Sequence, residues 1–157
     1  DGWDQCVQVN LSGTFYVTKR AIPLLRRSAA ASIVNVASTA ALFGYPLRSS
    51  YAATKWAMIG LMKTWAMELG PEGIRVNAVC PTSVEGPRID GVIEREAQAR
   101  GITFEEVREN YLRQSSMRTF INADDVADIV LFLCSDGAKK ISGQTISVDG
   151  HTENLSN

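Results

Sequence analysis

A short apolar run ending at a hydroxyl side chain is the feature that most constrains this chain. Residues 32–37 (Ser-Ile-Val-Asn-Val-Ala) are apolar apart from the opening serine and Asn35, and Ser38 follows them directly. Such a run, rich in β-branched residues, is typical of a parallel strand covered on both faces. Open α/β sheets place their ligands at the carboxyl ends of such strands. Ser38 is therefore expected at the edge of a sheet where a functional site forms.

A helix is predicted shortly after this edge, over residues 49–69. Tyr51 and Lys55 lie four positions apart in it, so one helical turn separates them on one face. An ammonium group held beside a phenol favours the phenolate, which makes Tyr51 a candidate general acid or base. Ser38 is expected to hydrogen-bond the same reacting oxygen. A Y-x-x-x-K pattern alone also occurs in many helices in which the tyrosine lies at a rim and the lysine is solvated.

The order of strand, serine, tyrosine thirteen positions later and lysine one turn further resembles the short-chain dehydrogenase/reductase family. The resemblance extends from Asn10 to the Ser-Val-Asp-Gly sequence at residues 147–150. It implies a Rossmann-like fold, NAD or NADP as cofactor, and interconversion of an alcohol and a carbonyl compound by hydride transfer. It also implies that Ser38, Tyr51 and Lys55 are catalytic.

An asparagine interrupts the apolar stripe of the first predicted helix, residues 3–28. Asn10 lowers helix propensity and needs a hydrogen-bond partner if it is buried, so a satisfied core or kink residue is one interpretation. Residues 9–14 (Val-Asn-Leu-Ser-Gly-Thr) resemble the family segment whose asparagine bends the helix and holds a water against the lysine. The resemblance therefore makes Asn10 the fourth catalytic residue.

The remaining pattern predicts only part of a dinucleotide-binding fold. Three strands are predicted, at residues 32–37, 74–80 and within 142–150, with helices between them. The glycine-rich first turn that binds a pyrophosphate is not recognisable in this sequence. We predict an α/β fold: the C-terminal part of a Rossmann-like, doubly wound parallel sheet of about three strands with flanking helices. Residues 1–157 are interpreted as a single partial domain, the catalytic half of a dinucleotide-dependent reductase.

The segment after the second strand, residues 81–87, is expected to meet the nicotinamide. The family commonly has Pro-Gly here, and four residues after that glycine a threonine that contacts the cofactor. In this sequence Thr82 replaces the glycine and Gly86 replaces the threonine. A threonine adopts positive φ less readily than a glycine, so the substitution is expected to restrict the loop. The expected cofactor contacts are Tyr51, Lys55, Pro81, Thr82 and Val84.

Residues 88–113 are the most polar section and predict two amphipathic helices separated by residues 101–103. Thr103 is the expected N-cap of the second helix, with Glu106 in the capping-box position. Their charged face is expected to be solvated. In the family an insertion here forms a mobile lid over the substrate, so residues 86–116 are predicted to be the lid.

The loop before the catalytic helix, residues 40–46, contains glycine and proline, which break regular structure. Three of the side chains in and after it either line a substrate pocket or pack the loop, and the sequence leaves the two alternatives open. These are Phe43, Tyr45 and Leu47.

The helix at 49–69 is apolar on nearly every side, so it must be covered on nearly every side. Ala53, Ala57 and Gly60 form a stripe of small residues that permits a second helix to approach closely. The resemblance implies that the complete protein forms a homodimer or homotetramer through this helix. Burial within one chain is the alternative.

Composition excludes several classes of function. The 157 residues are 45% hydrophobic and 21% charged with a net charge of −1, and no basic run stands out, so neither nucleic acid nor an acidic membrane surface is an expected partner. No apolar run reaches the ~18 residues of a membrane-spanning helix. Three widely spaced cysteines and one histidine favour neither a disulfide framework nor a metal site. We expect three buried thiols and a cytoplasmic location.

Two functions remain open. The first is an NAD(P)-dependent oxidoreductase acting on a small-molecule alcohol or carbonyl compound, with Tyr51 as general acid/base. The second is a truncated, non-catalytic remnant that acts as a structural or partner-binding module, because strand 32–37 would lack its usual neighbours. Sugar epimerases and dehydratases also use Y-x-x-x-K, but the compact serine-to-tyrosine spacing resembles the classical reductases more. The residues present do not discriminate NAD from NADP or identify the substrate.

Overall fold

The computed structural model describes residues 2–153 of the chain. One parallel sheet contains three strands in the order β1-β2-β3. The strands are β1 (Ser32–Val36), β2 (Arg75–Pro81) and β3 (Thr145–Val148). Val36 pairs with Val79, which pairs in turn with Ile146. The predicted α/β fold with about three parallel strands and flanking helices is confirmed.

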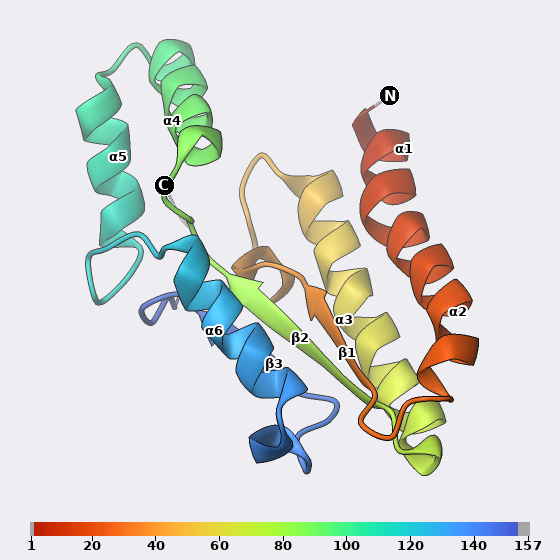
Figure 1. Cartoon of the computed structure of the whole chain (residues 1–157). Coiled ribbons are helices and arrows are strands. Elements are labelled where there is room, and N and C mark those ends of the chain that lie inside the picture. The colour runs from red at the N-terminus through yellow and green to blue at the C-terminus, as the bar shows by residue number, and fades with distance from the viewer. Residues whose placement is uncertain (1, 154–157) are drawn as a thin grey trace.

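Helices connect the strands and cover both faces of the sheet (Figure 1). The longer ones are α1 (Gly2–Cys6), the π-helical η1 (Val7–Ser12), α2 (Gly13–Leu25), α3 (Ser49–Leu69), α4 (Pro87–Arg100), α5 (Phe104–Arg113) and α6 (Ala123–Cys134). The first three form one continuous helical stretch that ends at Leu25, before the predicted end at residue 28. Helix α3 has the predicted bounds. Three of the predicted strand boundaries shift by one residue: β1 ends at Val36, and β2 begins at Arg75 and ends at Pro81.

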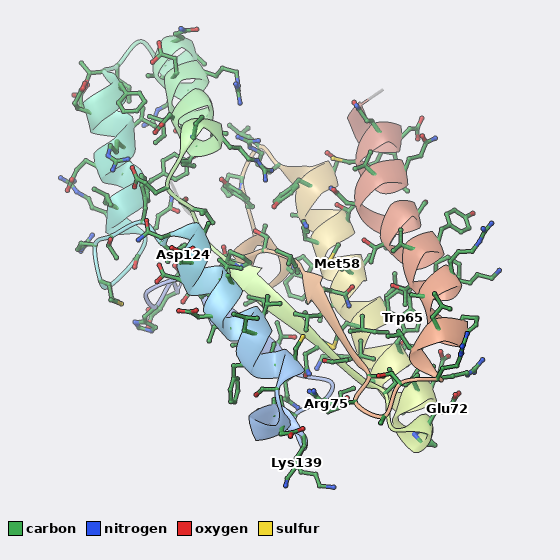
Figure 2. All side chains as sticks on the ribbon, viewed as in Figure 1. Met58, Trp65, Glu72, Arg75, Asp124 and Lys139 are labelled. Atoms are coloured by element: carbon green, nitrogen blue, oxygen red, sulfur yellow. The ribbon has the colours of Figure 1, made fainter. Side chains whose placement is uncertain are left out.

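The core lies between the sheet and α3. Met62 of α3 and Val76 of β2 have no exposed surface, and both belong to the largest cluster of buried apolar side chains. Met58 and Trp65 belong to the same cluster, and Trp65 faces α2, where its ring stacks on Phe15 at 6.3 Å between centroids (Figure 2). Helix α6 covers the opposite face of the sheet (Figure 1). A parallel sheet covered on both faces explains why β2 is apolar along most of its length.

Strand β1 lies at one side of the sheet. Within residues 2–153, β2 is the single strand paired with it. Val36, its last residue, is 52% exposed. The buried Asn35 Nδ2 has no hydrogen-bond partner among the described residues. One edge of β1 is therefore open in this part of the chain.

Helices α4 and α5 form a separate layer above the carboxyl end of β2 (Figure 1). They have an apolar cluster of their own, which contains Ile93, Val107 and Tyr111 and also Phe120 from the connector after α5. The Thr103 hydroxyl accepts a hydrogen bond from the Glu106 backbone N–H at 3.1 Å, and the Glu106 carboxylate accepts one from the Thr103 backbone N–H at 2.8 Å. The predicted capping box is confirmed.

Two local predictions were wrong. Residues 40–46 are not all loop, because a short 3-10 helix, η2 (Thr39–Ala41), begins directly after Ser38. Of the three cysteines only Cys80 is buried, whereas Cys6 is half-buried and Cys134 is exposed; all three carry free thiols. Cys134 is the last residue of α6. Within residues 2–153, no helix is both long and apolar enough to span a bilayer.

Candidate active site

A cavity of about 640 Å³ opens beyond the carboxyl ends of β1 and β2. Ser38, which follows β1, and Tyr51, in the first turn of α3, both line it. Residues 82–86, which follow β2, form another part of the wall. The sheet edge thus brings together side chains from segments that are 13 and more positions apart in the sequence.

Lys55 lies beside Tyr51 and is tied to β1. Its Nζ atom is 5.7 Å from the centroid of the Tyr51 ring and donates a hydrogen bond to the Val36 backbone oxygen at 3.1 Å. Burial lowers the pKa of Lys55, the charge of Arg88 lowers it further, and Cys80 acts in the opposite direction. The ammonium group is therefore held in a fixed place between the end of β1 and the phenol.

Ser38 has an extended backbone, with φ −176° and ψ 159°, and caps η2. Its Oγ atom accepts a hydrogen bond from the Ala40 backbone N–H at 3.2 Å. Because a serine hydroxyl both donates and accepts, this contact leaves its O–H to donate into the cavity. The short helix η2 thus orients the serine that the sequence predicted.

Asn10 lies in the π-helical segment η1, which faces α3. Its Nδ2 atom donates a hydrogen bond to Thr54 Oγ1 at 3.2 Å, and Thr54 Oγ1 donates to the Tyr51 backbone oxygen at 2.8 Å. Asn10 thus reaches α3 one position before Lys55, but it does not line the cavity. Single π-helical turns inside α-helices are frequent at functional sites.

Three cofactor contacts were predicted at the end of β2 and directly after it, and two of these residues line the cavity. Thr82 and Val84 line the cavity, whereas Pro81 is buried and does not. Thr82 is outside the left-handed region, so its replacement of glycine forces no positive φ there. Gly86 has φ 136°, a conformation that favours glycine over the threonine usual in the family.

The same segment makes a contact that the sequence did not predict. Val84 forms an isolated parallel bridge with Ile121. The Glu85 N–H donates to the Ile121 oxygen at 2.8 Å, and the Ile121 N–H donates to the Ser83 oxygen at 3.2 Å. These bonds hold the cavity wall against the connector that leaves α5. No local pattern indicates a pairing between segments so far apart.

Several further side chains line the cavity. Of the three candidates in the preceding loop, Tyr45 and Leu47 line it and Phe43 does not. Sequence reasoning missed Arg48 and Arg88, which also line it. For Arg48 a signal was present, because it lies three positions before Tyr51 and hence one helical turn away from it. Among residues 2–153, no group of three or more metal-ligating side chains gathers.

Comparison with known proteins identifies the family. Residues 1–151 match the family model described as enoyl-(acyl carrier protein) reductase. The D-beta-hydroxybutyrate dehydrogenase of Rhizobium meliloti is 38% identical over 149 residues, which cover 94% of this chain and 58% of that protein. The 3-oxoacyl-(acyl-carrier-protein) reductase of Thermotoga maritima is 37% identical over 150 residues, covering 96% of this chain and 56% of that protein.

Solved structures agree. Sorbitol-6-phosphate 2-dehydrogenase from Erwinia amylovora superposes with a TM-score of 0.89 at 28% identity, covering 95% of this chain and 59% of that one. A 4-hydroxyisoleucine dehydrogenase complexed with NADH has a TM-score of 0.76 at 27% identity and covers 98% and 59%. ElxO with NADP bound has a TM-score of 0.79 at 27% identity and covers 94% and 56%.

The chain belongs to the short-chain dehydrogenase/reductase family, a family of NAD- or NADP-dependent oxidoreductases. It spans less than two thirds of the length of the curated relatives that it matches.

The residues beyond β1 and β2 fit the nicotinamide riboside part of such a cofactor. A lysine ammonium has three N–H donors, and within the described residues the Val36 oxygen accepts from Lys55. Ribose hydroxyl groups are suitable acceptors for the remaining donors. In residues 82–84 the Thr82 N–H and the Ser83 oxygen bond Val148 and Ile121, whereas the N–H groups of Ser83 and Val84 have no backbone acceptor among the described residues and suit a carboxamide.

Proposed function

We propose that the complete protein is an NAD(P)-dependent oxidoreductase that interconverts an alcohol and a carbonyl compound, with Tyr51 as the general acid/base. The observation that carries this proposal is the anchored Lys55 ammonium, 5.7 Å from the ring of Tyr51, at a cavity that Tyr51 shares with Ser38. A positioned proton donor beside a fixed positive charge is what reduction of a carbonyl group requires.

In the reductive direction, Tyr51 donates its proton to the oxygen that becomes the alcohol. Ser38 donates a hydrogen bond to the same oxygen, and the Lys55 ammonium stabilises the phenolate left on Tyr51. The nicotinamide, when bound, supplies the hydride. Asn10 holds the water through which the proton on Tyr51 is replenished. The Asn10 side chain is fixed beside the first turns of α3 because it donates to Thr54 Oγ1, which donates in turn to the backbone oxygen of Tyr51.

The cofactor is NAD or NADP, and its nicotinamide end is held by residues of this chain. Lys55 and Tyr51 would hold its ribose. Pro81, Thr82 and Val84 would contact the nicotinamide, Pro81 through its backbone because its side chain is buried. Residues 86–116, which contain α4 and α5, form the lid over the substrate. Free thiols on all three cysteines support a reducing, cytoplasmic setting.

The complete protein is proposed to be a homodimer or homotetramer that assembles through α3. Large apolar side chains are exposed on α3 and the neighbouring α2: Tyr16 is 62% exposed and Met67 is 80% exposed. A shallow groove between the two helices is lined by Phe15 and Gly60, among others. Contiguous exposed apolar surface of this kind marks interaction sites. Gly60→Glu should dissociate the oligomer, which light scattering after size-exclusion chromatography measures.

The open edge of β1 favours a second candidate, a non-catalytic structural or partner-binding module. Val36 is half-exposed, and Asn35 Nδ2 has no partner among the described residues. Titration of the 157-residue chain with reduced nicotinamide cofactor, followed by fluorescence, separates the two candidates. Saturable binding favours the oxidoreductase, whereas a soluble, cooperative fold without binding favours the module.

Tyr51→Phe tests the proposal in the complete protein, because it removes one hydroxyl and preserves the ring. General acid/base catalysis contributes about 10²- to 10⁴-fold, so kcat should fall by that factor with little change in the unfolding midpoint. Tyr16→Phe is the matched control, because it removes a hydroxyl outside the cavity and keeps the ring at the proposed subunit surface; it should keep normal turnover. Near-normal activity of Tyr51→Phe would remove Tyr51 from the mechanism.

A further inference from the structure

We propose that the cavity selects an anionic substrate, a small hydroxy acid or oxo acid whose carboxylate is bound by Arg48 and Arg88. The inference rests on the proposed oxidoreductase function of the same cavity, and it names the class of substrate and two residues that determine specificity. Three observations carry it: the positions of the two arginines, the ion pair that already occupies the acidic residue of the wall, and the apolar side chains in the rest of the wall.

Arg48 lies directly before α3, in the N-cap position, where its side chain makes no capping hydrogen bond. It lines the cavity together with Tyr45, and its guanidinium lies 5.9 Å from the centroid of the Tyr45 ring. No ion pair joins Arg48 to an acidic residue within residues 2–153. Arg48 and Tyr51 line the same cavity, so the N–H groups of the guanidinium are available to a carboxylate bound there.

Arg88 reaches the cavity from the opposite side. It is the second residue of α4, directly after Pro87. It lines the cavity, and its charge lowers the pKa of Lys55. Arg88 also makes no ion pair within the part of the chain that the structure describes. Arg48, directly before α3, and Arg88, in the first turn of α4, thus both line the cavity.

The acidic residue of the wall does not compensate these charges. Glu85 is the one carboxylate among the described residues that line the cavity. Both of its oxygens accept hydrogen bonds from Arg108 Nη2, at 3.0 and 3.2 Å. Arg108 lies in α5, outside the wall, so Glu85 is already paired. The cavity is left with the positive charges of Arg48 and Arg88 and with Lys55 behind Tyr51. Guanidinium groups bind planar carboxylates through paired hydrogen bonds, and a cavity of one sign of charge concentrates the opposite ion.

The rest of the wall limits the size and character of the substrate. Val84, Ile89 and Val92 give the cavity an apolar side. A short carbon chain can lie against these side chains while its hydroxyl meets Tyr51 and its carboxylate meets an arginine. We assign the anion that the arginines bind to the substrate. The phosphates of the cofactor are the other candidate anions, and kinetics separates these two assignments.

The test compares acids with their neutral esters in the complete protein. Oxidation of 2-, 3- and 4-hydroxybutanoate and of their methyl esters is followed by formation of reduced nicotinamide. For at least one of the three positions, kcat/KM should be at least tenfold higher for the acid. Arg48→Gln and Arg88→Gln should each lower kcat/KM for that acid by about ten- to a hundredfold, since hydrogen bonds to charged groups are lost, and leave the ester unchanged.

Arg95→Gln is the control, because Arg95 also lies in α4 but does not line the cavity. It should leave both substrates unaffected. Esters that are used as well as the acids at every position would overturn the inference, and so would arginine variants that lower both equally. A rise in KM for the cofactor alone, with unchanged acid-over-ester preference, would assign the arginines to the cofactor phosphates and also overturn it.

A binding measurement without turnover keeps the inference separate from the proposed function. Ligand-observed NMR measures the binding of each hydroxybutanoate and its ester to the complete protein and its variants. If no nicotinamide-linked turnover occurs but an acid binds and loses its affinity in Arg48→Gln and Arg88→Gln, the carboxylate site stands and the oxidoreductase proposal falls. If no acid binds more tightly than its ester, the inference is wrong whatever the turnover.

Discussion

Helix α3 and the pair of helices α4 and α5 both contribute to the cavity, but they are held in place in different ways. Helix α3 has no side-chain N-cap and buries Met58, Met62 and Trp65 against the sheet and α2. Helices α4 and α5 are packed mainly on each other around Ile93 and Val107. They also have local stabilisation that α3 lacks: the capping box at Thr103 and ion pairs one turn apart, from Arg100 to Glu96 and from Arg113 to Glu109.

With the proposed roles of these residues, the difference separates chemistry from selection. Tyr51 and Lys55 are carried by the helix whose packing is part of the main core, so their geometry depends on the whole fold. Arg88 is carried by a pair with its own small core, whose sequence can change without disturbing the sheet. An active site on rigid elements combined with a separately packed wall is a common solution to keeping chemistry constant while specificity varies.

The largest effect should come from the core under α3. Met62→Ala removes a fully buried side chain and should lower the free energy of unfolding of the complete protein by about 2–5 kcal/mol. Glu68→Ala, at an exposed polar position of the same helix, is the control and should change it by less than about 0.5 kcal/mol. Chemical denaturation measures both. Equal effects would show that α3 is not held by its buried face.

Ile93→Ala makes the corresponding change in the core of α4 and α5. Ile93 is fully buried, so the local loss is again about 2–5 kcal/mol. If the pair is packed separately, hydrogen exchange of residues 87–113 should accelerate strongly while β2 stays protected. Ile93→Val should have a smaller effect of the same kind. Equal acceleration in β2 would contradict a separate core.

Thr103→Ala should weaken α5 alone. The substitution removes the hydroxyl that accepts from the Glu106 N–H, and loss of such a cap costs about 1 kcal/mol. Exchange of the first-turn amides of α5 reports the loss, and Thr103→Ser should restore protection because serine caps equally well. Unchanged exchange in Thr103→Ala would show that packing alone sets the start of α5.

The smallest effect concerns alkaline pH. Burial raises the pKa of Tyr111, and its contacts with Tyr45 and Glu96 raise it further. Because the folded state keeps the proton that the unfolded chain releases near ~10, this contribution is fully present below pH ~10 and is lost as pH rises toward the folded pKa. Exchange in α5, corrected for the base-catalysed rise of the intrinsic rate, should therefore accelerate between about pH 10 and 11 in the wild type. The dependence should be flatter in Tyr111→Phe, and equal slopes would exclude Tyr111 as the cause.

The features that are local in sequence were predictable. The bounds of α3 follow from its uninterrupted helical pattern, and the start of α5 follows from Thr103 and Glu106, whose interaction spans three positions. Tyr51 and Lys55 could be paired from spacing alone. The carboxyl-edge rule for parallel sheets then brought Ser38 to the same cavity.

The features that depend on distant contacts were not predictable. The π-helical turn at η1 has no characteristic amino-acid composition. It is stabilised by the hydrogen bond from Asn10 to Thr54, 44 positions away. Arg88 lines the cavity because of the way α4 packs, and no periodicity within α4 reveals that packing. The uncompensated positive charge of the cavity wall likewise depends on a distant contact, because Arg108 pairs with Glu85, 23 positions away.

The hydrogen bond from Lys55 Nζ to the Val36 oxygen connects the charge that we propose to be catalytic to a peptide group. Val36 is the last residue of the outermost described strand, and a strand bonded on one side can rotate its peptide planes more freely than one bonded on both. Any partner that hydrogen-bonds along the other side of β1 would fix that carbonyl and, through it, the ammonium. Completing the sheet would then hold the ammonium more rigidly beside Tyr51 and so favour proton transfer, without any contact with the substrate.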